Sequence, residues 1–342
     1  MKKIKKNLPL VPVSVVIPMR NSETTIGSAL RSLLRQKYPI EKIIVVDNAS
    51  IDNSIKKVEE IKNKSIIPIH IMKRKENKGL CASYNFGVNN SISSLVVFMH
   101  SDSSLSTVKE LEKLTKPLTQ EAVVASYPSN ILPKEIWDKY SFWQKRHQIK
   151  EVNNKRAGMN GKFDCIRRKI FLKIGGFDEV TYNAKCGFGG EDADLFFKLE
   201  KEGRVILSEA KVIHLHRLSK DYSFFDWMVN RKLLAKTYGR LLRFRGNSLP
   251  ISTKGKGLFI PLGFLIFTVK PILAILPFVP KFHLFGIILL FVYVFLNSPR
   301  MYLTRSTLFN PCIILLPFID IFLVYYETFW MSQAFLLAKR NV

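Results

Sequence analysis

The chain has few cysteines, few acidic residues, and none of the short motifs that bind phosphate through glycines. Its four cysteines are scattered, with no C-x-x-C pair and no dense framework. A disulfide-stapled secreted module is therefore excluded, and reduced thiols in a cytosolic compartment are expected. The basic N-terminal residues are followed by a short apolar stretch that Pro9, Pro12 and Pro18 interrupt. This stretch lacks the continuous apolar core of a secretory signal, so none is predicted.

The shortage of acidic residues leaves a large positive charge. There are 53 Lys and Arg against 27 Asp and Glu, a formal net charge of +26. Such a surplus implies an anionic partner: nucleic acid, an anionic membrane surface or a phosphorylated substrate. No recognition helix or aromatic-stacking sheet motif is recognisable in the sequence, and basic residues gather just before an apolar tail. Nucleic acid is therefore not expected as a partner.

The composition changes sharply near residue 257. Up to Lys256 there are 47 basic and 25 acidic residues, and after it only 6 and 2. Three apolar stretches follow, each with at most one charged residue: 258–279, 282–299 and 308–326. The second of them holds 18 residues without a charge, about the minimum for a bilayer span. We predict a membrane region over 257–342 with two to three hydrophobic spans.

A basic linker, 218–256, precedes the membrane region. From Lys220 to Lys256 there are nine Lys and Arg against two Asp. The positive-inside rule then places residues 1–256 in the cytoplasm, and the linker can rest on anionic headgroups. Prolines break the first apolar stretch, and Lys339-Arg340 would favour the same side, so a re-entrant or interfacial piece is expected. The prediction is a multi-pass protein of the cell membrane.

Residues 1–217 alternate between apolar runs and helical patterns, as in one catalytic domain. Apolar runs predict strands at 13–17, 43–46, 66–71, 95–99 and 122–126. Apolar residues at helical spacing predict helices at 26–34 (capped by Asn21 or Ser22), 55–61, 82–88 and 137–149. Strands that alternate with helices indicate βαβ units, an α/β fold and a mostly parallel sheet.

Three of the predicted strands have their carboxyl ends at Met19, Asp47 and Asp102. Right-handed crossovers bring the carboxyl ends of such strands to one edge, where ligands bind. Neither G-x-G-x-x-G nor a P-loop follows the first strand. The sheet is therefore expected to bind a ligand through acidic residues, which fits a nucleotide diphosphate carried with a divalent metal. Alternatively, Asp102 is a solvated residue that caps a helix starting near Ser103.

Two further groups of residues are candidates for a catalytic base and for a metal site. Glycines lead into Glu191-Asp192 at the start of a helical pattern, and a helix N-terminus holds a carboxylate ionised, which suits a general base. Plain N-capping is the alternative. His214 and His216 share one face of a strand, but no third His or Cys at ligand spacing supports a zinc site.

The order of these motifs resembles the family 2 glycosyltransferases of the GT-A fold, in particular membrane-anchored bacterial and archaeal members. The resemblance covers about residues 11–217. It rests on these segments, in sequence order: Val13–Pro18, Ile43–Ser50, Asn77–Gly79 with Asn85, Leu95–Asp102, Gly175–Asp178, Gly190–Leu195 and Val212–His214.

The resemblance implies a role for each candidate residue. Asp47 would hydrogen-bond the nucleobase of the donor. Asp102 would bind the metal, Mg²⁺ or Mn²⁺, as the last residue of the family's Asp-x-Asp motif, with His214 as an additional ligand. Asp192, next to Glu191, would be the catalytic base. The other positions implied in donor-nucleotide binding are Pro18, Arg20, Asn77, Gly79, Asn85 and His100.

The sequence departs from the family pattern in two places. His100 stands where the first acid of Asp-x-Asp is expected. A histidine can hydrogen-bond a ribose but is neutral or cationic near pH 7, so weaker metal binding is expected, or basic side chains carry part of the diphosphate charge. The processive Gln-x-x-Arg-Trp motif is absent between Glu191 and the first apolar stretch, which favours transfer of single sugars.

The expected function is that of an inverting glycosyltransferase. It would move one sugar from a nucleotide-diphosphate sugar to a hydroxyl of a lipid-linked or cell-surface glycan acceptor at the cytosolic membrane face. One alternative is a polyprenyl-phosphate sugar synthase, whose acceptor phosphate is already ionised and needs no base. Another is a non-catalytic, membrane-anchored binder of glycans or nucleotide sugars, which only His100 supports.

Overall fold

The computed structural model describes residues 10–149, 159, 161–183, 190–214, 221–245, 262–297 and 299–337. The chain forms two compact units. The first unit comprises residues 1–129, 159–179 and 198–214, and the second comprises 130–158, 180–197 and 215–342. The second unit thus takes two segments from within the predicted catalytic domain. The domain boundaries at 217 and 256 remain predictions.

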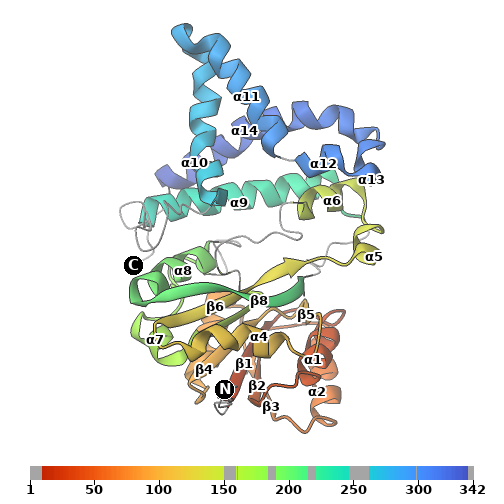
Figure 1. Cartoon of the computed structure of the whole chain (residues 1–342), viewed down its shortest axis with the longest axis vertical. Helices are drawn as coiled ribbons and strands as arrows, with labels where there is room; N and C mark the ends of the chain where they lie inside the picture. The colour runs from red at the N-terminus through yellow and green to blue at the C-terminus, as the bar shows by residue number, and fades with distance from the viewer. Residues whose placement is uncertain are drawn as a thin grey trace, which may run out of the picture. The chain divides into compact units, whose positions relative to one another are not determined.

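The first unit is built on an eight-stranded sheet of order β3-β2-β1-β4-β7-β6-β8-β5 (Figure 1). Its strands are β1 (Val13–Met19), β2 (Ile40–Asn48), β3 (Ile69–Arg74), β4 (Leu95–Met99), β5 (Ser103–Leu105), β6 (Val123–Ile131), β7 (Phe163–Arg167) and β8 (Arg204–His214). The strands from β3 to β4 pair in parallel, whereas β4 with β7, β6 with β7 and β5 with β8 pair antiparallel. The expected α/β fold is confirmed, with antiparallel strands added on one side of a parallel core.

Helices cover both faces of the parallel strands, which is why β1 and β4 are buried along their whole length. The helices of this unit are α1 (Ile26–Leu34), α2 (Ser54–Lys62), α3 (Leu80–Asn89), α4 (Glu110–Thr115) with the 3₁₀ turn Lys116–Thr119, and α7 (Arg168–Lys173). α1, α2 and α4 supply apolar side chains to the core on one face, together with Val15 and Val97. On the other face, the rings of Tyr84 (α3) and Phe171 (α7) lie 4.5 and 5.3 Å from that of Phe98.

Several local predictions are wrong. The helix expected at 137–149 is two helices, α5 (Lys134–Trp137) and α6 (Phe142–Gln148), because Ser141 forms a capping box with Gln144 and restarts the chain. Neither Asn21 nor Ser22 caps α1, whose N-cap residue is Thr25. The third strand begins at Ile69, not at Ile66.

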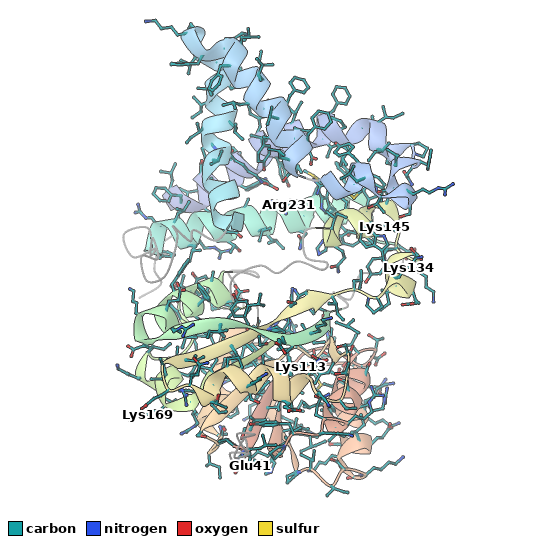
Figure 2. The ribbon with its side chains drawn as sticks, in the orientation of Figure 1. Glu41, Lys113, Lys134, Lys145, Lys169 and Arg231 are labelled. Carbon is teal, nitrogen blue, oxygen red and sulfur yellow. The ribbon has the colours of Figure 1, made fainter. Side chains whose placement is uncertain are left out.

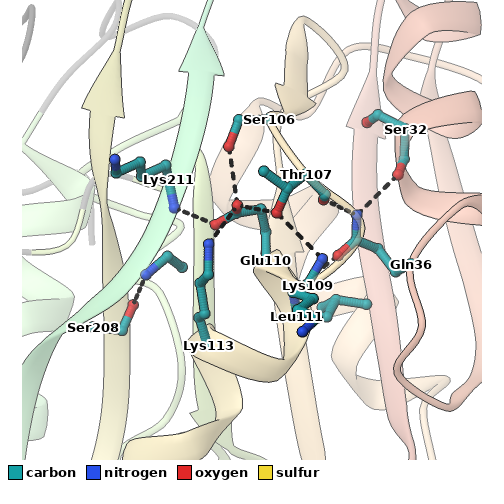
Figure 3. Close-up of polar contacts among 11 residues, drawn as sticks. Ser32, Gln36, Ser106, Thr107, Lys109, Glu110, Leu111, Lys113, Ser208 and Lys211 are labelled. Atoms are coloured by element: carbon teal, nitrogen blue, oxygen red, sulfur yellow. Dashed lines mark hydrogen bonds and ion pairs between the residues drawn. The ribbon is translucent and has the colours of Figure 1, made fainter.

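A buried carboxylate, Glu110, ties the start of α4 to strand β8 (Figure 3). It accepts hydrogen bonds from the Ser106 and Thr107 hydroxyls at 3.0 and 2.5 Å, and from the Lys113 ammonium at 2.9 Å. The backbone N–H of Lys211 in β8 donates a fourth, at 2.7 Å. Burial acts to raise the pKa of Glu110, but these hydrogen bonds outweigh it, and the pKa lies below its usual value.

We expect Glu110→Gln to lower the free energy of unfolding at neutral pH by about 1.5–3 kcal/mol, the worth of hydrogen bonds to a charged group. Because the folded pKa lies below the unfolded one of about 4.3, the stabilisation is present above the unfolded pKa. It is lost as the pH falls through the folded pKa. The difference between wild type and variant should therefore shrink on acidification, as followed by unfolding of the full chain in detergent from neutral pH downward. Glu112→Gln, an exposed carboxylate two residues along the same helix, is the control, and an equal loss there would contradict the assignment.

The second unit is helical. Besides α5 and α6 it contains the start of α8 (Glu191–Glu202) and a C-terminal set: α9 (Phe224–Arg245), α10 (Leu262–Ile275), α11 (His283–Asn297), α12 (Pro299–Leu303), α13 (Arg305–Leu308) and α14 (Cys312–Leu337). Two 3₁₀ turns, Leu276–Phe278 and Pro280–Phe282, connect α10 to α11.

Two segments of the second unit are long and apolar enough to cross a membrane, by length and composition: Pro280–Asn297 and Cys312–Leu337. They correspond to the second and third predicted stretches. The start of the first stretch, and the residues Lys339 and Arg340, lie outside the described residues. In Figure 1, α10 and α11 stand side by side as a hairpin, and α14 runs beside α9.

Candidate active site

Three side chains converge beyond the carboxyl end of β4: His100, Asp102 and His214. The Asp102 Oδ1 atom lies 3.1 Å from His214 Nε2 and 3.9 Å from His100 Nδ1. The two histidine nitrogens are 3.5 Å apart. His214 and Asp102 are largely withdrawn from solvent, with side chains 8 and 14% exposed. The described part of the chain thus contains a compact His/Asp/His cluster.

A strand pairing explains why His214 reaches residues so distant in sequence. After Asp102 the chain does not start a helix, so the alternative of a helix-capping Asp102 is wrong. Instead it forms the short strand β5, which pairs antiparallel with the end of β8. Ser103 is the register partner of His214, and this places the histidine beside the polar turn that follows β4.

The residues of the cluster fit a divalent metal. Imidazole nitrogens and a carboxylate oxygen are common donors for first-row metal ions. Atoms separated by 3.1, 3.5 and 3.9 Å can all be reached by one cation with bonds of about 2 Å, the usual length for such ligands. His100, expected to weaken metal binding, instead lies where it can supply a third ligand atom. It is a histidine that the sequence spacing did not connect with His214.

The loop at 161–162 of the first unit holds His100 in place. The backbone N–H of His100 donates to the carbonyl of Lys162 at 3.3 Å, and a Cβ on Gly161 would lie 3.1 Å from His100 Nε2. The Tyr84 hydroxyl donates to the Gly161 carbonyl at 2.8 Å, and the Gly161 N–H donates to Asp164 at 2.6 Å. The ring is therefore held in place by a packed loop.

Asp47 lies at the end of β2, and its side chain has one unsatisfied oxygen. The residue is 2% exposed. Its Oδ2 accepts a long hydrogen bond from the Ser50 N–H at 3.4 Å, whereas Oδ1 is buried and has no hydrogen-bond partner among the described residues. Buried carboxylate oxygens normally have partners, so this atom is free to accept a hydrogen bond from a ligand.

The end of β2 is joined to the loop at 77–79 through two asparagines. The Asn48 amide donates to Asn77 Oδ1 at 2.6 Å, and its oxygen accepts from the Lys78 N–H at 3.0 Å. Asn77 Oδ1 also accepts from the Gly79 N–H at 3.0 Å. Asn77 and Gly79 are thus held next to the end of β2. Asn48 was not among the predicted site residues, although it directly follows Asp47.

The remaining donor-site predictions stay predictions, but the structure describes their surroundings. Pro18 is buried near the end of β1, opposite Val46 in β2, and Arg20 is exposed just beyond it. Asn85 forms hydrogen bonds elsewhere: its amide group exchanges two bonds of 2.9 Å with the backbone of Phe177 and donates to Glu179 at 2.8 Å. These contacts show that Asn85 positions the loop after α7.

Glu191 and Asp192 form the first turn of α8, as expected, and they belong to the second unit. Both are half-buried. Asp192 Oδ1 accepts from the N–H of Ala193 at 2.8 Å. Gly190 precedes them with a φ of +94°, and a Cβ there would lie 2.8 Å from Thr237 on α9. The helix start that carries the two acids is therefore packed directly on α9. His216 lies outside the described residues.

The family model "Glycosyl transferase family 2" matches residues 14–175. Among curated proteins, an uncharacterised glycosyltransferase of Haemophilus influenzae is 20% identical over 195 residues, which cover 56% of this chain and 62% of that protein. The O-antigen chain rhamnosyltransferase RfbN of Salmonella typhimurium is 22% identical over 226 residues, 62% of this chain and 69% of that protein. The match thus covers less than two thirds of the Haemophilus protein.

Among solved structures, a mannosyltransferase from Pyrobaculum calidifontis in complex with GDP-Man and Mn²⁺ is similar in fold. The TM-score is 0.60 at 16% identity, and the alignment covers 96% of this chain and 88% of that one. At this identity the likeness concerns the fold alone. The fold is that of the GT-A glycosyltransferases, extended by C-terminal helices.

Proposed function

Residues 14–175 match the glycosyltransferase family 2 model, and from that premise we propose that the whole protein is an inverting glycosyltransferase. It transfers one sugar from a nucleoside-diphosphate sugar to an acceptor hydroxyl, with inversion at the anomeric carbon. The acceptor is a lipid-linked or cell-surface glycan, met at the cytosolic face of a membrane. The observation that carries the proposal is the His100/Asp102/His214 cluster beyond β4.

The donor side of the proposal rests on two features of one sheet edge. Asp47 is the penultimate residue of β2, His100 and Asp102 follow β4, and both strands pair with β1. The buried Asp47 Oδ1 atom accepts a hydrogen bond from the donor's nucleobase. His100, Asp102 and His214 hold the divalent cation that accompanies the diphosphate. Once bound, that cation supplies stabilisation of negative charge on the departing nucleoside diphosphate.

The acceptor side rests on Asp192. Its carboxylate lies in the first turn of α8, at the helix end that favours negative charge. Asp192 accepts the proton of the acceptor hydroxyl, so that the oxygen attacks the anomeric carbon as the bond to the diphosphate breaks. Glu191, next to it, orients the acceptor. The exposed apolar helices of the second unit bring the enzyme to the membrane in which the acceptor is carried.

A panel of nucleotide sugars tests the proposal. Membranes that contain the full chain are incubated with guanine, uracil and thymine sugar nucleotides, after EDTA treatment and with Mg²⁺ or Mn²⁺ added back. We expect turnover of one donor class, loss of activity with EDTA and recovery with metal. Failure to turn over any donor would leave the non-catalytic binder as the function.

One alternative remains within the same chemistry, a polyprenyl-phosphate sugar synthase. Its acceptor oxygen is a phosphate that needs no base, so Glu191-Asp192 at a helix start favours the hydroxyl acceptor instead. The two products differ in stability, because a sugar phosphodiester is acid-labile. Mild acid treatment of the lipid-extractable product therefore separates the two reactions.

A further inference from the structure

The C-terminal helix α14 presents an apolar face to the outside of the second unit. Its exposed side chains recur at helical spacing and are 52–71% exposed: Ile314, Leu315, Phe318, Phe322, Phe329 and Leu336. Its charged residues, Asp320 and Glu327, lie on the opposite face and are fully buried. An apolar face of this extent, about 33 Å over 22 residues, is typical of a surface that contacts lipid.

The buried face of α14 is held by ion pairs and by α9. Glu327 accepts from Arg231 at 2.5 Å and pairs with Lys270 of α10. Arg231 is labelled on α9 in Figure 2. Asp320 pairs with Arg146 of α6. Both acids of α14 are thus paired with basic residues inside the unit, and α14 turns its charges inward.

Helices α9 and α14 run in the same direction and touch along most of their length (Figure 1). Residues four apart on α9 meet residues four apart on α14: Trp227 packs with Leu323, Arg231 with Glu327, and Ala235 with Met331. Further along, a Cβ on Gly239 would lie 2.2 Å from the Met331 carbonyl, so only glycine allows this approach. Any orientation of α14 in a membrane is thus also the orientation of α9.

α9 is strongly basic. It carries six Lys and Arg and one acid, Asp226. Lys232 and Lys236 place their ammonium groups 3.7 and 4.5 Å from the centre of the Trp330 ring of α14, and the Arg243 guanidinium lies 5.7 Å from the ring centre of Phe335. Desolvation and the neighbouring charges of Lys232 and Arg240 lower the pKa of Lys236. A concentration of positive charge therefore flanks the apolar face of α14.

These contacts decide how α14 meets a bilayer. Its 26 residues span about 39 Å, long enough to cross a core of about 30 Å. If it did cross, α9 would cross beside it and carry Lys232, Lys236 and Arg240 into the hydrocarbon, where charged side chains are the most costly residues. Lying flat, the pair instead puts the phenylalanines among acyl chains, Trp330 at the interface and the basic stripe among headgroups.

We propose that α14 does not cross the membrane but lies in its plane beside α9, docked on an anionic bilayer. The hairpin of α10 and α11 leaves from and returns to the same side, so the chain before α10 and the chain after α14 stay on one side. The predicted third span is thereby replaced by an in-plane helix. The proposal does not depend on the transferase activity.

Depth measurements along α14 test the orientation. Single spin labels are placed on the full chain in a cysteine-free background, reconstituted in phosphatidylglycerol-containing vesicles, at four outward positions seven residues apart: Leu315, Phe322, Phe329 and Leu336. We expect equal depths, from oxygen and aqueous nickel accessibility. A steady change of about 10 Å between successive labels would mean that α14 crosses the bilayer and would overturn the proposal.

A topology measurement gives a second readout that does not depend on labelling. Tags are placed before Met1 in one version and after Val342 in another, and protease is added to sealed vesicles of known orientation. We expect both tags to be digested from the same side. Digestion from opposite sides would overturn the proposal even if the labelled variants of the first experiment failed to fold.

The preference for anionic lipid is tested by charge removal. Four basic residues of α9 are replaced together by Gln: Lys232, Lys236, Arg240 and Arg243. The control replaces four exposed lysines on α2 and in the turn after it: Lys56, Lys57, Lys62 and Lys64. In nanodiscs formed from mixed phosphatidylcholine and phosphatidylglycerol, the wild type and the control should enrich the anionic lipid. The α9 variant should lose the enrichment. Equal enrichment in all three would overturn the anionic part of the proposal.

Discussion

Replacement of Asp192 by Asn is expected to abolish sugar transfer while leaving donor binding intact. An amide cannot take the proton of the acceptor hydroxyl, and a positioned general base contributes about 10²–10⁴-fold in rate. The side chain keeps its size and can still accept from the Ala193 N–H, so α8 should keep its start. We would measure kcat with the identified donor, and donor affinity by calorimetry without acceptor.

The control for this variant is Glu209→Gln, an exposed carboxylate on β8, which should keep full activity. Two possible results for Asp192→Asn lead to different conclusions. Substantial activity of Asp192→Asn with an acid-labile lipid product would favour the polyprenyl-phosphate acceptor, which needs no base. Full activity with an acid-stable product would remove Asp192 as the base and leave Glu191 as the next candidate.

Replacement of Asp102 by Asn is expected to reduce metal-dependent activity by at least about 100-fold. Changes to outer-shell partners of a metal already cost about 10–100-fold in affinity or activity, and Asp102 is the only carboxylate of the His/Asp/His cluster in the described chain. Direct Mn²⁺ binding, followed by the electron paramagnetic resonance signal of the free ion, should weaken in parallel. Unchanged Mn²⁺ binding would contradict the metal assignment.

His100→Asp provides a matched variant that changes the ligand set without removing it. A carboxylate suits Mg²⁺ and Mn²⁺, whereas an imidazole suits later first-row metals. We therefore expect the variant to stay active and to use Mg²⁺ better relative to Mn²⁺ than the wild type does. His70→Asn, a change on the exposed face of β3, should leave the metal preference unchanged.

The parallel core of the fold could be predicted from sequence because its signal is local. β1, β2 and β4 each contain a run of apolar residues, and the polar residues at or just after their carboxyl ends mark the ligand-binding edge. The helix at 137–149 was predicted as one because its aromatic spacing is continuous. The break depends on the Ser141 hydroxyl accepting from Gln144, a short-range cap that an apolar pattern does not reveal.

The metal cluster could be predicted only in part. The family resemblance indicates Asp102 and His214, but in the motif itself His100 is only a departure from the expected acid. Its role as a third donor depends on the pairing of β5 with β8, which joins segments about a hundred residues apart and leaves no periodic trace. Both histidines can be read from the sequence, but the sequence does not show that they lie close together in space.

The amino-acid composition likewise does not predict how the apolar helices are oriented in a membrane. α14 has the length and hydropathy of a span, and nothing in its own residues distinguishes a crossing from an in-plane helix. The distinction comes from its neighbour, because Gly239 and Arg231 bind a basic helix to it along its length. The hydropathy of a single helix does not include that constraint.

The pairing of β5 with β8 also has a consequence for biogenesis. His100 and His214 are separated by 114 positions, so a ribosome must release nearly the whole first unit before the cluster can assemble. Pairings of this sequence separation form late, because the intervening chain must be ordered first. A cation bound there therefore stabilises the finished fold and not its precursors, which couples completion of the molecule to metal loading and keeps a nascent chain from capturing the ion early.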